Sequence, residues 1–448
     1  MSNGVADTIQ VPRLGPSSVV TWRRVRQPHL AVALLCAVPF IDVIVDQLYN
    51  ALQLGFGLLS LPQIVRGCLL AIAWVLMVDE GRQNAASHRI HWAVLAIPAI
   101  FLVVTALEIV TTGQAYTRTI VACFQIVYWC TMWALTARTI TQPLLARKVL
   151  TAFAFGSLIT AVSVALGYVT GATLTRAYHD VRASAGFFGN GKGIAGSLAA
   201  SAFIFAYMSA QFKKKVYLLF GAFCTVATFL TYARAGIVGL LVAAAWSSTW
   251  ALSRKASATW ARRFIGVVGL SVGLLIFAIG VSDLGRRWAD VLNHNHNKAG
   301  SGRVLLWTLA WDSFIQEQPS QQLFGLGVEG MYKLTYLRLH TATVGHTHSD
   351  LFDILLIAGV VGLLAALTLP VSIFKLGALL PSRSPEYGLF WSIGCIMLAQ
   401  ALLTGQFFLP DTMAYYLVTM TAVVSLHACQ DSPTVGRGRP RLRILVQP

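Results

Sequence analysis

Two histidines and two aspartates stand against a long apolar run in the last third of the chain. The stretch GHTHSDLFDILLIAGVVGLL, residues 345–364, contains His346 and His348, followed by Asp350 and Asp353. Ionisable groups at the edge of such a run are costly to bury, so their presence there indicates a function. Histidine is the side chain best suited to accept a proton near neutral pH, which makes His348 a candidate general base.

Three arginines from separate segments could act together with this histidine. They are Arg182, Arg234 and Arg303, and each lies close to an apolar run or in a segment between two of them. A guanidinium stays charged and offers paired donors that match phosphate oxygens. Arginines beside a base at a membrane surface favour a lipid-linked phosphate as the substrate.

Transmembrane helices must position these residues. Of the 448 residues, 56% are hydrophobic and only 11% are charged, whereas a soluble domain has about 25% charged residues. The apolar residues cluster into runs of about 18 to 25, the length at which a helix crosses a bilayer. The composition predicts an all-α polytopic membrane protein.

We expect about 12 transmembrane helices in a single domain over residues 29–428, between tails at 1–28 and 429–448. The expected spans are 29–48, 64–79, 91–111, 119–137, 149–170, 191–210, 216–232, 235–252, 264–282, 349–374, 387–408 and 411–428.

Positive charge orients these spans. Lys and Arg gather in alternate loops and in both tails, which places both termini in the cytoplasm and the three arginines with His348 on the outer side. The net charge of +17 then reflects short loops facing an anionic leaflet, without a nucleic-acid partner.

One outer loop is much longer than the rest, covering residues 283–348 between the ninth and tenth spans. Within it, GRVLLWTLAWDSFIQEQP has apolar residues at helical spacing and is ended by Pro319, which predicts an amphipathic helix. We interpret Trp288, Trp307 and Trp311 as an interfacial aromatic belt.

Four motifs in order along residues 182–364 resemble those of one protein family. They are RASAGFFGNGKG, LTYARAG, SGRVLLW, and the spacing of His348-Ser349 to Gly359 and Gly362, which fits H-[NSR]-x9-G-x-x-[GTY]. In LTYARAG, Ala233 stands where the family usually has serine before the arginine. The chain resembles the superfamily of O-antigen ligases and Wzy-type O-antigen and exopolysaccharide polymerases.

The resemblance implies a metal-independent, inverting glycosyltransferase of the bacterial inner membrane with its active site facing the periplasm. Such an enzyme moves a glycan from undecaprenyl diphosphate to an acceptor hydroxyl in lipopolysaccharide or surface polysaccharide assembly. A ligase uses lipid A-core as the acceptor, and a polymerase uses a second lipid-linked oligosaccharide. We take the ligase as the first hypothesis and the polymerase as the alternative.

The resemblance also implies roles for individual residues. His348 would be catalytic, and Arg234 and Arg303, with Arg182 as a third, would hold the diphosphate. Asp350, Asp353 and His346 would be supporting groups. The alternative for His348 is an interfacial residue beside a helix cap at Ser349, with both aspartates in solvent.

No cofactor is expected, because the histidine pairs of the long loop lack the carboxylate support of a metal site. A twelve-span transporter or lipid flippase is a more distant alternative, but the chain shows no internal repeat. Glu108, Asp42 and Asp46 lie near the outer ends of spans, and the sequence assigns no role to them.

Overall fold

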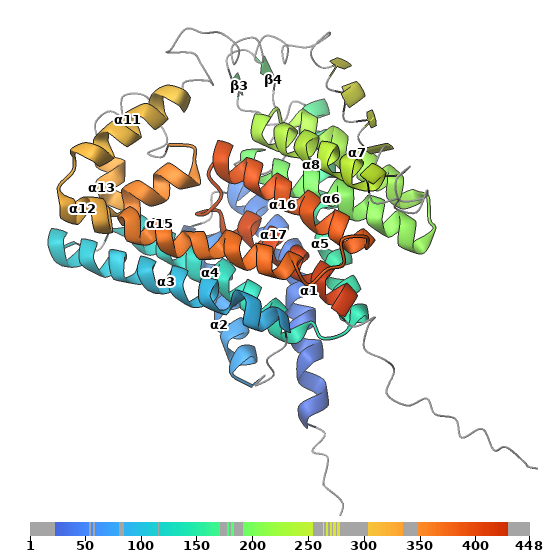
Figure 1. Cartoon of the computed structure of the whole chain (residues 1–448), viewed down its shortest axis with the longest axis horizontal. Helices are drawn as coiled ribbons and strands as arrows, with labels where there is room; N and C mark the ends of the chain where they lie inside the picture. Colours follow the sequence, from blue (N-terminus) through green and yellow to red (C-terminus); the bar gives the residue numbers. More distant parts are fainter. Residues whose placement is uncertain are drawn as a thin grey trace, which may run out of the picture.

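The chain folds into a bundle of long helices with a group of shorter helices at one end (Figure 1). The computed structural model describes residues 23–52, 55–56, 59–79, 85–114, 116–170, 177–178, 181–182, 191–253, 303–334 and 347–428, together with 263 and short pieces between 266 and 277. Two hairpins of two-residue strands also occur, β1 (Gly55–Phe56) with β2 (Leu59–Ser60) and β3 (Ala177–Tyr178) with β4 (Val181–Arg182).

The long helices are α1 (Arg23–Leu52), α2 (Leu61–Asp79), α3 (Ala85–Thr112), α4 (Thr117–Thr139), α5 (Pro143–Thr170), α6 (Gly191–Phe212), α7 (Val216–Leu230), α8 (Arg234–Ser253), α15 (Asp350–Gly377), α16 (Pro385–Leu403) and α17 (Pro410–Ala428). The shorter helices are α11 (Arg303–Gln316), α12 (Pro319–Phe324) and α13 (Gly327–Lys333).

This is a multi-pass membrane protein. Within the described part of the chain, eight helices are long and apolar enough to cross a membrane, in α1, α3, α4, α5, α6, α8, α15 and α16. Two shorter apolar helices, at Leu61–Met77 and Val216–Leu230, lie where the second and seventh spans were expected. The expected ninth span, 264–282, falls largely outside the described residues.

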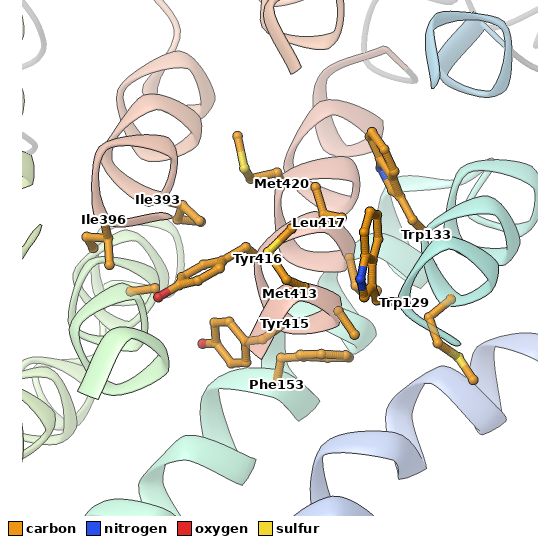
Figure 2. Packing of buried hydrophobic residues seen from close by; sticks show 14 of the residues in the cluster. Trp129, Trp133, Phe153, Ile393, Ile396, Met413, Tyr415, Tyr416, Leu417 and Met420 are labelled. Atoms are coloured by element: carbon orange, nitrogen blue, oxygen red, sulfur yellow. The ribbon is translucent and has the colours of Figure 1, made fainter. Parts of the chain in front are cut away.

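Helix α17 is not among those eight, and its surroundings are protein. Nearly all of its side chains are buried, including polar ones such as Thr419 and Thr421. Figure 2 shows α17 at the centre, with its aromatic and sulfur-containing side chains packed between α4, α5 and α16. The Trp133 Nε1 donates to the Thr421 hydroxyl at 2.9 Å, so polar atoms inside the bundle find partners there.

Helix α15 is broken at Gly359, which corrects the expectation of one continuous span over 349–374. Gly359 has φ 63° and ψ −161°, a conformation open essentially to glycine alone. The break divides α15 into a short segment, 350–358, and a longer one, 360–377. It also brings the connection between α12 and α13 against the backbone of α15, where the Leu326 N–H donates to the Leu356 carbonyl at 2.8 Å.

The two segments of α15 run in opposite senses along α3. Asp350 is bound to Phe407, and Phe407 packs on Phe101 with ring centroids 5.4 Å apart. The break lies beside α12 and α13. The first turn of α13 is bound to Glu108 of α3, which lies about 10 Å further along α3 than Phe101. The short segment therefore runs toward the C-terminal end of α3, and the long segment runs back along α3 in the opposite direction.

The turn between α16 and α17 lies inside the bundle, away from one of its ends. We call that end, at which α3 finishes and α4 begins, the site end. Trp129 lies about 18 Å along α4 from its first residue, and its Nε1 donates to the Phe407 carbonyl at 3.1 Å. The start of α15 is bound to this turn, so it too lies inside the bundle, away from the site end.

Gly359→Ala should destabilise the protein strongly. An alanine there would hold a left-handed φ, and its Cβ would overlap the Leu323 carbonyl of α12. The strain alone costs about 1–3 kcal/mol. We expect a lower melting temperature and a lower membrane yield, measured on the purified protein. The control is Gly67→Ala in α2, where an added Cβ meets no atom within 4 Å. Equal melting temperatures for the two variants would contradict this account.

Candidate functional site

His348 lies in a short turn that immediately precedes α15, inside the bundle. Its φ of 62° is in the left-handed region, which non-glycine residues rarely adopt. The neighbours Thr347 and Ser349 are buried, and His348 itself is partly exposed. Strained backbone of this kind persists only where the surrounding structure holds it, and it is frequent at functional sites.

Hydrogen bonds from Asp353 hold this turn. One carboxylate oxygen of Asp353 accepts from the Thr347 N–H and from the Thr347 hydroxyl, each at 2.7 Å. The Asp353 N–H donates to the Ser349 carbonyl at 3.0 Å. The residues on both sides of His348 are therefore tied to one buried residue, Asp353, of the next helical turn: Thr347 to its side chain and Ser349 to its backbone.

Trp307 of α11 holds the same turn from the other side. Its Nε1 donates to the Thr347 carbonyl at 3.1 Å, and its ring stacks on Phe352 with centroids 6.0 Å apart. Trp307 therefore packs inside the protein, which corrects its assignment to an interfacial belt. Trp288 lies outside the described residues.

Asp350 fastens the start of α15 to the turn between α16 and α17. Its Oδ1 accepts from the backbone N–H groups of Gln406 and Phe407 at 2.7 and 2.8 Å. Both Asp350 and Asp353 are buried, so the alternative in which they face solvent is wrong. Ser349 occupies the cap position of α15, but its side chain makes no cap hydrogen bond.

Arg303 is the first residue of α11 and lies one helical turn before Trp307. Residues four apart share one face of a helix, so Arg303 and the side chain that holds the His348 turn lie on the same side of α11. Burial, and then the positive charge of Arg234, lower the pKa of Arg303 to about 10. Arg303 therefore stays protonated at neutral pH, next to a second guanidinium that repels it.

Arg234 is brought to this place by the sharp connection between α7 and α8. Tyr232 has φ 50°, and the Ala233 N–H donates to the Thr231 hydroxyl at 3.2 Å, which ends one helix and starts the next within three residues. Arg234 is the first residue of α8, whose N-terminal N–H groups add partial positive charge. Two arginines and a helix N-terminus form a site suited to an anion with several charges.

A family model for O-antigen ligase matches residues 216–367. These residues belong to the O-antigen ligase family. The match covers Arg234, Arg303, His348 and the break at Gly359. A search of curated proteins found no match for the chain.

The family spacing from His348 to Gly359 has a physical basis in this O-antigen ligase domain. The histidine turn lies at the inner end of the short segment of α15, and Gly359 ends that segment against α12. The spacing thus sets the length of the helix that leads from the histidine out to the break.

Arg182 and His346 are not tested by these contacts. Arg182 belongs to β4, outside the residues that match the ligase family, and its side chain lies outside the described part of the structure. His346 also lies outside the described residues, as do His294 and His296.

Glu108 connects the ligase-family residues to the rest of the bundle. It is buried and accepts from the N–H groups of Val328 and Glu329 at 3.1 and 2.8 Å, and from the Thr119 hydroxyl at 2.9 Å. A carboxylate at the start of α13 satisfies N–H groups that a helix leaves without partners. Glu108 therefore fixes α13 to α3 and α4.

Asp42 and Asp46 of α1 form buried ion pairs with Arg66 of α2. The Arg66 Nε lies 3.0 Å from Asp42 Oδ1, and its Nη2 lies 3.2 Å from Asp46 Oδ2. Both aspartates, with Asp411, line a cavity of about 60 Å³ between α1, α5, α6 and α17. Its carboxylates would repel a diphosphate, so this cavity differs in chemistry from the arginine pair.

Replacing Asp353 tests whether it positions His348. In Asp353→Ala, the buried N–H and hydroxyl of Thr347 lose their partner, which costs about 1–3 kcal/mol. We expect kcat to fall about tenfold or more with little change in the donor KM. Asp353→Asn keeps an oxygen that accepts both bonds and should restore most of kcat. Equal kcat values in both variants would show that the contact does not position His348.

Proposed function

We propose that the protein is a membrane glycosyltransferase that moves a glycan from undecaprenyl diphosphate to an acceptor hydroxyl. One observation carries this proposal. Helix α11 bears Arg303, whose pKa is lowered in part by the charge of Arg234. It also bears Trp307, which donates a hydrogen bond to the turn of His348. An anion site and a base from three separate segments are thus joined through one helix, within the residues that match the O-antigen ligase family.

The membrane arrangement that fits this function has twelve spans with both termini in the cytoplasm. Residues 29–428 would form one transmembrane domain in the bacterial inner membrane, with cytoplasmic tails at 1–28 and 429–448. The loop over 283–348 and the site end of the bundle would face the periplasm. The clustering of Lys and Arg in the other loops supports this orientation.

The reaction would be a single displacement at the anomeric carbon. The acceptor oxygen forms the new bond to that carbon while its proton passes to His348, and the bond from the carbon to the diphosphate oxygen breaks. The released diphosphate keeps the electron pair and stays on Arg234 and Arg303, with Arg182 as a third candidate. Attack opposite the leaving group inverts the anomeric configuration.

The arginine pair is suited to the leaving group. Two guanidiniums that repel each other are stabilised when a dianion binds to both, and they are stabilised further as negative charge grows in the transition state. His348 is suited to the acceptor, because a sugar hydroxyl is a poor nucleophile until a base accepts its proton.

The acceptor distinguishes a ligase from a polymerase. We propose the ligase, with lipid A-core as the acceptor, and keep the Wzy-type polymerase as the alternative. The test is a transfer assay with purified protein, one lipid-linked oligosaccharide donor and each acceptor in turn, with products resolved by mass. Product on lipid A-core alone supports the ligase, and extended lipid-linked oligosaccharide supports the polymerase. No product with either acceptor would contradict glycan transfer.

Transfer should continue in a chelator. In this proposal the arginines neutralise the diphosphate, so a divalent cation has no role. Among the residues that the structure describes, no three His, Cys, Asp or Glu side chains are grouped so that they could hold a metal ion. We expect equal rates with and without EDTA in the assay above. A loss of rate that added Mg²⁺ or Mn²⁺ restores would contradict this prediction.

A further inference from the structure

Helix α11 carries an apolar stripe that no other described element covers. Val304, Trp311 and Ile315 are exposed large hydrophobic residues. At 3.6 residues per turn they fall within about 40° of one another around the helix. The opposite side of α11 packs on α15 through buried residues such as Leu306 and Ala310.

The polar residues of α11 occupy the neighbouring arc. Thr308, Asp312 and Gln316 are exposed, and they follow the apolar stripe by about 40° to 120° around the helix. On its other edge the stripe borders the face with Arg303 and Trp307. The helix therefore has a solvated side, an apolar side and a protein side, as interfacial helices do.

The apolar stripe continues onto α12. The Gln322 Nε2 donates to the Ile315 carbonyl at 2.9 Å, which ties α12 to the end of α11. Leu323 and Phe324 of α12 are also exposed. The Leu323 carbonyl lies against Gly359, so these side chains adjoin the start of the long segment of α15.

The long segment of α15 indicates which environment contacts the exposed apolar residues of α11 and α12. Its exposed residues, Val360, Leu364, Leu367 and Val371, follow a helical stripe along a membrane-spanning helix. An exposed apolar stripe on such a helix contacts lipid. The surface over α11 and α12 is thus continuous with a lipid-facing surface, and its occupant has the same chemistry.

We propose that the apolar stripe of α11, with Leu323 and Phe324, docks on phospholipid acyl chains at the site end of the bundle. The helix that bears Arg303 is then a membrane-surface element, held between the leaflet and α15. This inference depends on the position of α11 at the membrane boundary and does not depend on the transfer reaction.

Spin labels on α11 test the proposal. The seven native cysteines are replaced, and a nitroxide is attached to Ile315→Cys or Asp312→Cys in protein reconstituted into lipid nanodiscs. Leu364→Cys on α15 is the lipid-facing reference. We expect the label at 315 to collide with oxygen about as often as at 364 and to be shielded from a water-soluble nickel chelate. The label at 312 should be open to the chelate.

Equal access of the chelate to 312 and 315 would overturn the proposal. A second measurement needs no substitution and covers the case in which the cysteine-free protein fails to fold. Wild-type protein is placed in nanodiscs with a phospholipid that carries a diazirine in its acyl chain, and the labelled peptides are mapped after irradiation. Labelling of residues 303–316 at a level similar to 360–377 supports the proposal, and labelling of 360–377 without 303–316 overturns it.

Discussion

His348→Ala should abolish glycan transfer while the protein remains at normal abundance in the membrane. In the proposed mechanism the base is needed only in the transition state, where it accepts the proton of the acceptor hydroxyl, and general-base catalysis contributes about 10²–10⁴-fold to a rate. A partly exposed side chain in a turn held by Asp353 and Trp307 contributes little to folding. The measurement is transfer by purified protein, with surface polysaccharide in a complemented null strain beside it.

The left-handed backbone at position 348 makes further variants informative. Alanine resists this conformation, whereas asparagine is enriched there and glycine adopts it freely. His348→Asn and His348→Gly should therefore keep the turn and still lack activity, because neither side chain accepts the proton. The matched control is His91→Ala, an exposed histidine of α3. Transfer at the wild-type rate in His348→Asn or His348→Gly would remove the histidine from the mechanism.

Arg234→Ala and Arg303→Ala should each lower transfer by about tenfold to a hundredfold. A charge-assisted hydrogen bond contributes about 1.5–3 kcal/mol, which corresponds to that range if the contact is made in the transition state. Lysine keeps the charge but loses the paired donors, so Arg234→Lys and Arg303→Lys should recover part of the loss. The rates are measured with undecaprenyl-diphosphate glycan as donor.

The double variant tests whether the two arginines share one anion. Side chains that act on the same ligand have non-additive effects, so the loss in the double alanine variant should differ from the product of the single losses. Arg118→Ala is the matched control, since Arg118 is an exposed arginine at the same end of the bundle, paired with Glu329 at 3.6 Å. Strictly multiplicative losses would mean that the arginines bind separately, and the diphosphate would have to be sought near Arg182.

The positions of the long helices could be predicted from the sequence because an apolar run of bilayer length is typical of a membrane-spanning helix and of little else. The break in α15 could not be predicted in this way. Residues 354–374 are predominantly apolar on both sides of the break, and hydropathy does not record the direction of a chain. Gly359 was noticed as part of a family motif, but its left-handed φ and its contact with α12 depend on a segment some 35 residues earlier in the chain.

The charged residues of the site could be predicted from the sequence, but the contacts that hold them in place could not. Arg234, Arg303 and His348 stand out because each lies beside an apolar run or at the start of a helical segment and within a motif that resembles the family. Trp307 looked like a membrane anchor, because tryptophan at an amphipathic helix usually is one. Asp350 and Asp353 were named as supporting groups, with solvated carboxylates at a helix start as the alternative, but the groups that they bind were not predicted. The roles of all three residues follow from hydrogen-bond partners elsewhere in the chain, which local patterns do not reveal.

The ion pairs between Arg66 and the two aspartates of α1 constrain how this protein is made. During synthesis α1 leaves the ribosome first and reaches the translocon with Asp42 and Asp46 still lacking a counterion. A charged side chain opposes the insertion of a helix, by about 2.5–3.5 kcal/mol at the centre and by less toward the ends, and Arg66 has the same kind of effect in α2. Together the two helices neutralise these charges at 3.0 and 3.2 Å. They should therefore enter the bilayer together as a hairpin. The first effect of replacing Arg66 should be that α1 fails to insert.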